Sequence, residues 1–320
     1  MTSLLPSSGR LVLAASTGGH LAQLSRIAPS LGASDDSLWV TFDSPQSQSL
    51  LRGKDVLYVP YVSPRDVKGV IAARRLIDEQ LSRSGTHYDG VVSTGAAVAL
   101  SAFTARLTRK LPRLYIESVS RTHGPSLTGR IVATSRLASL RTQHKVWEHG
   151  RWRYEGSVLD EYETGATGGT PHARPRLFVT LGTIRPYRFD ALVDAVLATG
   201  LADETTVWQL GVTERNDLPG RVVGQVSAHE FERHARDADV VITHAGVGTI
   251  MQLLDWGKSP LVVPRRRSAG EHVDDHQSFI TELLRERGLG VEREVHRLDA
   301  AAIYEAAGKY TVPRARVVLV

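Results

Sequence analysis

The chain has 320 residues, no cysteine, 42% hydrophobic residues, 23% charged residues and a formal net charge of +5. This composition is that of a globular protein of about two domains, and it excludes collagen-like, coiled-coil and wholly disordered chains, disulfide scaffolds and Cys-ligated metal sites. Residues 1–160 carry a charge of +8 and residues 161–320 a charge of −3. The basic half indicates an anionic partner (nucleic acid, a membrane face or a phosphorylated lipid), unless its arginines are simply solvated.

Strands and helices alternate along the first half of the sequence. Helices are predicted from Gly18-Gly19 to about residue 31, over residues 67–82 and over residues 96–110. Short, continuous apolar runs predict buried strands at residues 11–15, 38–42, 56–59, 91–93 and 114–116. Continuous apolar strands separated by helices indicate a parallel sheet that is covered on both faces.

The second half repeats this alternation after a break. Residues 161–175 are rich in Gly, Thr and Pro, have no apolar period and are predicted to be a linker. Strands follow at residues 177–181, 207–210, 240–243 and 261–263, with helices at 190–199 and 249–256, the latter closed by Gly257. The predicted fold is therefore α/β, with doubly wound, Rossmann-like domains at residues 1–160 and 176–320.

Three turns of the first half lie where ligands of such sheets bind, between the end of a strand and the start of a helix. Backbone N–H groups exposed by glycine, small hydroxyls and helix N-termini suit a diphosphate, although glycine also simply permits a tight turn. The first turn does not have the dinucleotide spacing G-x-G-x-x-G. The turns contain Thr17, Gly18, Gly19 and His20; Ser93, Thr94 and Gly95; and, after the strand-end Glu117, Arg121.

The strongest local signal runs from Thr243 to Thr249, followed by residues 270–277. His244 ends a predicted strand, and the glycine turn after it opens a helix whose N–H groups would face an anion. Carboxylates and an amide in residues 271–277 suit sugar hydroxyls. The alternative for His244 is a strand-end histidine with purely structural partners, and the alternative for residues 271–277 is a solvated loop.

On these motifs the sequence resembles the family 28 glycosyltransferases of GT-B fold, which consist of two Rossmann-like domains facing across a cleft. It is most similar to bacterial exopolysaccharide and capsule enzymes, whose halves match the two subunits of the dolichol-diphosphate N-acetylglucosaminyltransferase. The acceptor half of that group has Gly-Gly-His-Leu and Ser-Thr-Gly turns, matched at residues 18–21 and 93–95, and a strand-end Glu, matched at Glu117. The motifs of the donor half match residues 179–183, 244–248 and 270–277.

The resemblance implies inverting transfer of a sugar from a UDP-sugar to a polyprenyl-diphosphate-linked glycan in exopolysaccharide or cell-envelope polysaccharide synthesis. It places the enzyme at the cytoplasmic face of the plasma membrane and implies no cofactor and no metal. Many relatives have a ribose-binding Glu on the helix after the glycine turn, whereas this chain has Gln252 nearby. A UDP-sugar 2-epimerase and a non-catalytic, nucleotide-binding partner of a glycosyltransferase remain the alternatives.

Roles for individual residues follow from the resemblance. The catalytic base is assigned to His20, whose side chain has a suitable pKa, with Glu117 as the rival. The acceptor diphosphate is assigned to Thr17, Gly18, Gly19, Ser93, Thr94, Gly95 and Arg121. The donor is assigned to Gly182, Thr183, His244, Ala245, Gly246, Gly248, Thr249, Gln252, Glu271, Asp275 and Gln277.

Two further patterns bear on partners. Asp237-Ala238-Asp239 resembles an Asp-x-Asp metal motif but is predicted to end a helix before a buried strand. A helix over residues 98–111 would carry Leu100, Phe103, Leu107 and Leu111 near one face, beside basic residues, and would suit an anionic membrane surface if that face is not part of the core. No nucleic-acid recognition motif is present, and no apolar run is long enough to span a membrane.

Overall fold

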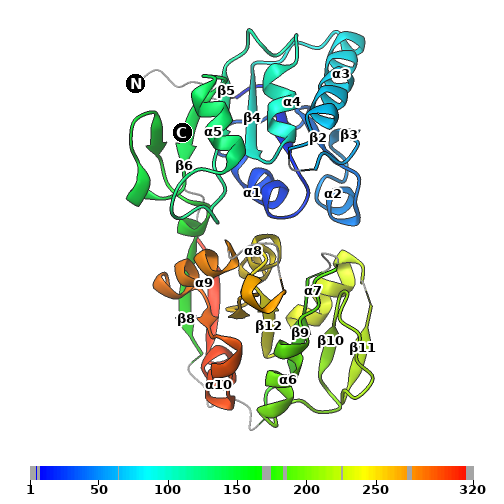
Figure 1. Ribbon diagram of the computed structural model, residues 1–320, viewed down its shortest axis with the longest axis vertical. Helices are drawn as coiled ribbons and strands as arrows, with labels where there is room; N and C mark the ends of the chain where they lie inside the picture. The colour runs from blue at the N-terminus through cyan, green and yellow to red at the C-terminus, as the bar shows by residue number, and fades with distance from the viewer. Residues whose placement is uncertain are drawn as a thin grey trace. The chain divides into compact units, whose positions relative to one another are not determined.

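The computed structural model describes residues 5, 8–63, 65–167, 174–182, 186–224, 226–271 and 276–314. The chain divides into two compact units, of which the first ends at Glu161 and the second comprises Tyr162–Arg314. Each unit contains a parallel sheet with helices on both faces (Figure 1). This confirms the predicted α/β class with two Rossmann-like domains.

The sheet of the first unit has the strand order β3-β2-β1-β4-β5-β6-β7, with every neighbouring pair parallel. The chain order reverses between β1 and β4, so the loops that follow these two strands diverge and leave room for a ligand. The strands are β1 (Leu11–Ala15), β2 (Leu38–Phe42), β3 (Asp55–Val59), β4 (Gly90–Gly95), β5 (Arg113–Ile116), β6 (Ser139–Thr142) and β7 (Trp152–Tyr154).

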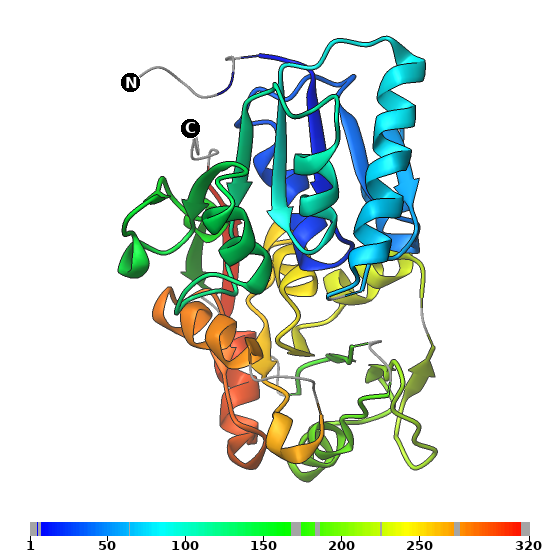
Figure 2. The same ribbon diagram turned by 45° about the horizontal axis from the view of Figure 1, so that its top comes forward.

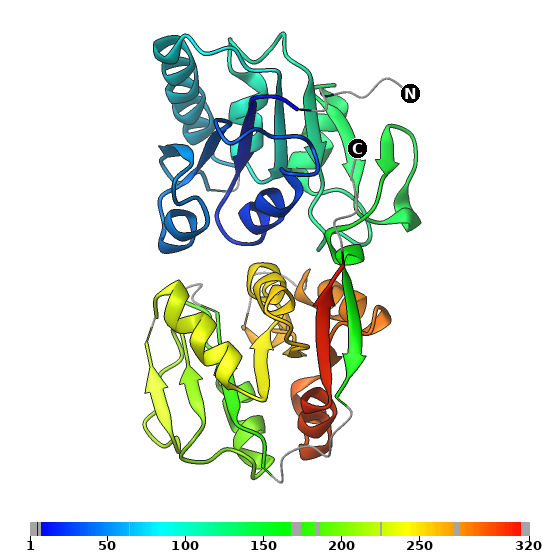
Figure 3. The ribbon, with the colours of Figure 1, turned by 180° about the vertical axis from the view of Figure 1, so that it is seen from behind.

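Helices cover both faces of this sheet. Val12 and Val40 point to the face covered by α3, α4 and α5, where they join one buried cluster, and α1 covers the opposite face (Figures 1 and 3). In Figure 2 the long α3 is seen beside the strands it covers. The helices are α1 (Gly19–Ile27), α2 (Pro45–Leu50), α3 (Val67–Ser84), α4 (Val98–Thr104) and α5 (Leu127–Thr134), with 3₁₀ turns at Lys145–Trp147 and Val158–Glu161.

The helix predicted over residues 96–110 ends early, at Thr104. Ala105 leaves the helix with a ψ of 142°, and the Thr108 hydroxyl donates to the Ala102 carbonyl oxygen at 2.6 Å, which satisfies one of the carbonyls left open at the helix end. Phe103 is buried, whereas Leu107 is exposed. The prediction of one continuous helix over residues 98–111, with a single apolar face, is therefore wrong.

The second unit repeats the architecture of the first. Its parallel sheet has the order β11-β10-β9-β12-β13-β14, with the reversal between β9 and β12. The strands are β9 (Leu177–Thr180), β10 (Val207–Gln209), β11 (Arg221–Val223), β12 (Val240–His244), β13 (Leu261–Val263) and β14 (Val291–Glu292). The helices are α6 (Asp190–Ala198), α7 (Ala228–Asp237), α8 (Val247–Asp255), α9 (His276–Glu286) and α10 (Ala300–Ala307), with 3₁₀ turns at Arg267–Ala269 and Val295–Arg297.

Alternate residues of the second sheet serve opposite faces, as the two-residue period of a strand requires. Leu177 and Val179 pack in the cluster that contains α6 and α10, whereas Phe178 and Val241 pack with α7 and α8. Asp237 ends α7, and the Asp239 carboxylate accepts a hydrogen bond from the Arg176 backbone N–H at 2.8 Å. The prediction that Asp237-Ala238-Asp239 ends a helix is therefore confirmed.

A small antiparallel pair lies beside the second sheet. Strand β8 (Tyr162–Ala166) pairs with β15 (Lys309–Pro313), so part of the segment predicted to be a linker is ordered as a strand. The pair is fixed to α8 by the buried Thr311, whose hydroxyl donates to the Leu254 carbonyl oxygen at 3.0 Å. Among the described helices of both units, none is long and apolar enough to cross a membrane.

Candidate functional site

The loops after β1 and β4 bring His20 and Thr94 together where the first sheet reverses its strand order. Nδ1 of His20 lies 2.7 Å from the Thr94 carbonyl oxygen, and the Thr94 hydroxyl donates to the His20 carbonyl oxygen at 2.7 Å. A carbonyl oxygen only accepts, so Nδ1 carries the proton and Nε2 of the neutral ring keeps its lone pair. Gly95, at a φ of 130°, makes this packing possible, because a Cβ there would lie 2.6 Å from Cε1 of His20.

The surroundings of His20 favour its neutral form. Burial of the ring lowers the pKa of His20 below its usual value of 6.5, the hydrogen bond to Thr94 opposes this shift, and the positive charge of Arg121 adds to it. The imidazole is therefore deprotonated at neutral pH. A neutral histidine with a free Nε2 lone pair and a fixed ring has the properties of a general base.

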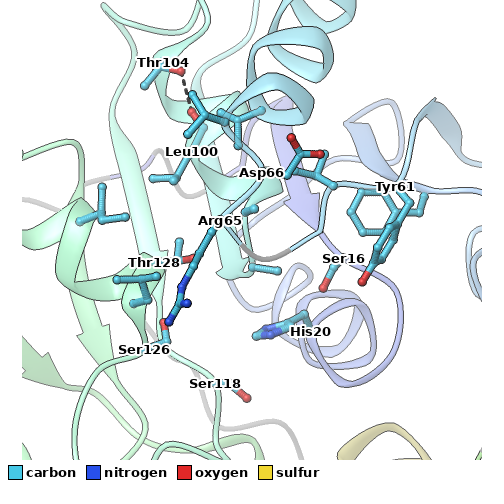
Figure 4. A pocket seen from close by; sticks show the side chains of 18 of the residues that line it. Ser16, His20, Tyr61, Arg65, Asp66, Leu100, Thr104, Ser118, Ser126 and Thr128 are labelled. Carbon is cyan, nitrogen blue, oxygen red and sulfur yellow. Dashed lines mark hydrogen bonds between the residues drawn. The ribbon is translucent and has the colours of Figure 1, made fainter. Parts of the chain in front are cut away.

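His20 lines a cavity of about 730 Å³ that lies wholly within the first unit (Figure 4). One part of the lining is apolar and comes from the loop after β3 and from α3, α4 and α5. Its side chains include Val62, Val67, Val70, Leu100, Leu127 and Ile131. The other part is polar and comes from the loops after β1 and β5, including Ser16, Thr17, Ser118, Ser120, Arg121 and Ser126.

Glu117, the other candidate base, is buried and fully hydrogen-bonded. Its Oε1 accepts from the Tyr115 hydroxyl at 3.1 Å and from the Ser118 N–H at 3.2 Å, and its Oε2 accepts from the N–H and hydroxyl of Ser126 at 2.9 and 3.0 Å. Burial raises the pKa of Glu117, although the hydrogen bonds oppose the shift. A Cβ on Gly129 would lie 2.2 Å from Oε2, so α5 packs directly on the carboxylate. These contacts hold the loop between β5 and α5 in place.

The residues predicted to bind the acceptor diphosphate take several positions. Thr17 and Arg121 line the cavity. The Gly18 N–H donates to the side chain of Gln46, so it is already occupied. Ser93 is buried, and its hydroxyl accepts from the Gly95 N–H at 3.2 Å. The remaining residues of this set start α1 (Gly19) or hold the imidazole of His20 (Thr94 and Gly95).

In the second unit, His244 ends β12, where the order of that sheet reverses. Its imidazole lies between two glycines, because a Cβ on Gly182 or Gly246 would lie 2.8 or 2.7 Å from Nε2 of His244. Gly246 precedes α8, and its N–H donates to the His244 carbonyl oxygen at 2.8 Å. Among the described residues, no side chain caps the first turn of α8, which contains Gly248 and Thr249. Such N–H groups, at the positive end of the helix dipole, bind anions. Ala245 is buried, and Gln252 is half-buried on α8.

Arg265, two residues beyond β13, was not among the residues singled out from the sequence. Its side chain is fully buried, Nη2 donates to the Gly182 carbonyl oxygen at 3.4 Å, and the guanidinium lies 5.4 Å from the centre of the Phe189 ring. Within the described residues, Nε and Nη1 have no hydrogen-bond partner. Burial lowers the pKa of Arg265 to about 10, so it is charged at neutral pH. A buried cation with two open donors beside Gly182 favours binding of an anion there.

Two of the residues predicted to bind the donor sugar hold the chain after β13. Oε1 of Gln277 accepts from the Arg265 N–H at 3.0 Å, and Oε2 of Glu271 accepts from the Arg266 N–H at 2.9 Å. Both side chains are buried. Thr183 and Asp275 lie outside the described residues. Within the part of the chain that is described, no three His, Asp or Glu side chains converge as a metal site.

A comparison with protein-family models finds a match in the second unit. Residues 196–307 match the family model for the glycosyltransferase family 28 C-terminal domain, a range that includes His244, α8 and Arg265. No curated protein matches the chain in sequence. The family match therefore covers most of the second unit.

Solved glycosyltransferases share the fold of the whole chain. MurG of Acinetobacter baumannii is 16% identical over 92% of this chain and 89% of its own, with a TM-score of 0.56. The spinosyn forosaminyltransferase SpnP is 16% identical over 94% and 93%, with a TM-score of 0.59. The spinosyn rhamnosyltransferase SpnG, in complex with thymidine diphosphate, is 16% identical over 93% and 89%, with a TM-score of 0.51. These likenesses confirm the predicted GT-B fold, and the family match on this fold supports the predicted glycosyltransferase activity.

Proposed function

We propose that the chain is an inverting glycosyltransferase that moves a sugar from a UDP-sugar to a polyprenyl-diphosphate-linked glycan in exopolysaccharide or cell-envelope polysaccharide synthesis. The cavity of the first unit carries this proposal, because its apolar wall, its arginines and a neutral histidine lie around one space. A lipid diphosphate needs an apolar wall and cations, and an attacking hydroxyl needs a base. The resemblance of the first-half turns to lipid-acceptor domains points to the same substrate class.

The second unit would bind the donor. The N–H groups of Gly248 and Thr249 in the first turn of α8 would face the diphosphate, with Gly246 allowing its close approach, because the Gly246 N–H already donates to the His244 carbonyl oxygen at 2.8 Å. Arg265 would stabilise the charge that develops on UDP as it leaves. The thymidine diphosphate named in the SpnG structure supports a nucleoside-diphosphate donor. We assign the ribose to Gln252, and the sugar to Glu271, Asp275 and Gln277. Because Arg265 and the α8 N-terminus supply positive charge, we propose that neither metal nor cofactor is required.

The first unit would supply the base. Nε2 of His20 takes the proton of the acceptor hydroxyl while the oxygen attacks the anomeric carbon of the donor sugar. The bond from that carbon to the β-phosphate oxygen breaks through an oxocarbenium-like state, and UDP leaves with the electron pair. One attack from the face opposite the leaving group inverts the configuration. We prefer His20 to Glu117 because both oxygens of Glu117 already accept two hydrogen bonds.

A membrane-embedded acceptor implies action at the inner face of the plasma membrane. Tyr61, Val67 and Leu127 line the cavity although 70%, 68% and 53% of each is exposed, and Lys68 and Arg130 are exposed close to them in the chain. Exposed apolar side chains with nearby cations suit an anionic lipid surface. We therefore propose that this rim, and not residues 98–111, contacts the membrane. Co-sedimentation with phosphatidylglycerol vesicles at low salt, lost in a Tyr61→Ser/Leu127→Ser variant, tests it.

The deciding experiment incubates the purified protein with a panel of UDP-sugars and a short polyprenyl-diphosphate sugar, followed by mass spectrometry. A product heavier by one sugar residue supports the proposal. Conversion of the UDP-sugar without acceptor would instead indicate a 2-epimerase, and binding without turnover would indicate a non-catalytic partner. Transfer to uncharged apolar alcohols, with none to the prenyl diphosphate, would overturn the acceptor class.

A further inference from the structure

The segment between β3 and α3 contains an arginine in an unfavourable backbone conformation. Arg65 has a φ of 67°, in the left-handed region where a Cβ is disfavoured and glycine is not. The next residue, Asp66, caps α3 by accepting from the Gly69 N–H at 2.9 Å, so the helix start does not depend on the side chain of Arg65. Strained non-glycine residues that persist next to a ligand site suggest a role for their side chains.

The side chain of Arg65 extends into the cavity of the first unit (Figure 4). The Arg65 side chain forms no hydrogen bond and no ion pair with any residue that the structure describes. Arg26 and Arg141 of the same unit, in contrast, form ion pairs with Glu161 and Glu155. Arg65 is an exposed residue of the cavity wall, so its guanidinium donors are available to a ligand that enters the cavity.

The charges around the cavity favour an anion. Arg65 and Arg121 are the arginines of the lining, and Asp66 is its one carboxylate among the described residues. The Asp66 carboxylate is committed to the cap of α3. The hydroxyls of Ser16 and Ser118 also line the space and can donate to an anion. The lining thus has more positive than negative charge, next to an apolar wall.

We propose that Arg65 binds the diphosphate of the prenyl acceptor, with the adjacent part of the prenyl chain along Val70, Leu100 and Ile131. This inference rests on the proposed function and adds the residue that would distinguish a phosphorylated prenyl lipid from the free alcohol. A guanidinium binds phosphate oxygens through two parallel N–H···O bonds, which a lysine cannot reproduce. Arg65 would act in binding, without contact to the reacting hydroxyl.

Calorimetric titration with farnesyl diphosphate and farnesol tests this inference without turnover. We expect Arg65→Ala to weaken farnesyl diphosphate binding by about 10- to 100-fold, the loss of a charge-assisted pair, and to leave farnesol binding unchanged. Arg65→Lys should retain part of the affinity. Arg75→Ala removes an exposed arginine of α3 that does not line the cavity and should bind both ligands like the wild type.

Arg65→Gly separates lost binding from lost folding. Glycine relieves the backbone strain, so this variant should unfold at a temperature about 2–4 °C higher while binding farnesyl diphosphate as weakly as Arg65→Ala. Wild-type affinity for farnesyl diphosphate in both variants would overturn the inference and leave the proposed function intact. An equal loss of affinity for farnesol and for farnesyl diphosphate would also overturn the inference, because it would indicate a distorted cavity. Arginine-dependent binding, without sugar transfer to any prenyl-diphosphate sugar, would support the site and overturn the proposed function.

Discussion

Replacing His20 by alanine removes the proposed base and little else. A positioned general base contributes a factor of about 10² to 10⁴ to turnover, which corresponds to about 3–5 kcal/mol of transition-state stabilisation. The variant also leaves the Thr94 carbonyl oxygen without the Nδ1 hydrogen bond, at a cost of about 1 kcal/mol in the free energy of unfolding. Because His20 belongs to the first unit, the affinity of the second unit for UDP-sugar should stay within about twofold of the wild type.

The assay follows UDP release with the donor and prenyl acceptor identified by the panel, together with calorimetric titration of UDP. His87→Ala is the matched control, because the side chain of His87 is 85% exposed and does not line the cavity. Ring ¹⁵N spectra of the wild type should show the tautomer of His20 with its proton on Nδ1. Turnover of the His20→Ala variant within tenfold of the wild type, in folded protein, would refute the assignment of the base.

Other substitutions test the remaining parts of the site. Gly246→Ala, whose new Cβ would lie 2.7 Å from Nε2 of His244, should weaken UDP binding at least tenfold in a titration, whereas Gly224→Ala, with open space around it, should not. Arg265→Gln should lower kcat about 10²- to 10³-fold, because it removes the cation proposed to stabilise the leaving UDP. It should not lower the stability measured in a denaturant melt, because it also removes a buried charge. EDTA should leave wild-type turnover unchanged. Glu117→Gln should lower the free energy of unfolding by about 1–3 kcal/mol, because it places an amide NH₂ among hydrogen-bond donors, and should keep turnover per folded molecule near the wild-type value.

The donor side shows what contiguous sequence can predict. The strand end, glycine turn and helix start around His244 are consecutive in the chain, so their relative positions follow from local geometry alone. Arg265 lies 21 residues beyond His244, and its importance depends on its burial and on two donors that have no partner among the described residues. The signal available in the sequence was an arginine run directly after an apolar strand, at the edge of the sheet where ligands bind.

The acceptor side shows the opposite case. His20 was singled out from its glycine turn, but Thr94 and Gly95 hold its ring, which only the pairing of β1 with β4 reveals. The apolar wall of the cavity comes from a loop and three helices, so no single stretch of sequence predicts it. The early end of α4 depends on the Thr108 hydroxyl, and β8 forms because β15 returns from the end of the chain. Both are tertiary contacts that override local pattern.

The cations around His20 connect acceptor binding to proton transfer. In the free protein, burial and the charge of Arg121 lower the pKa of His20, so turnover should fall only when the pH drops through that lowered pKa and the ring becomes protonated. A bound diphosphate would offset the positive charge of Arg121 and raise the pKa of His20, which makes it a stronger base when acceptor is present. The acid limb of kcat, which reports the bound enzyme, should therefore lie at higher pH than that of kcat/KM for the acceptor, which reports the free enzyme. Arg121→Gln should move the acid limb of kcat/KM to higher pH, toward the acid limb of kcat, because it removes a positive charge that lowers the pKa of His20. Acid limbs that coincide in the wild type would show that the diphosphate binds too far from His20 to affect it.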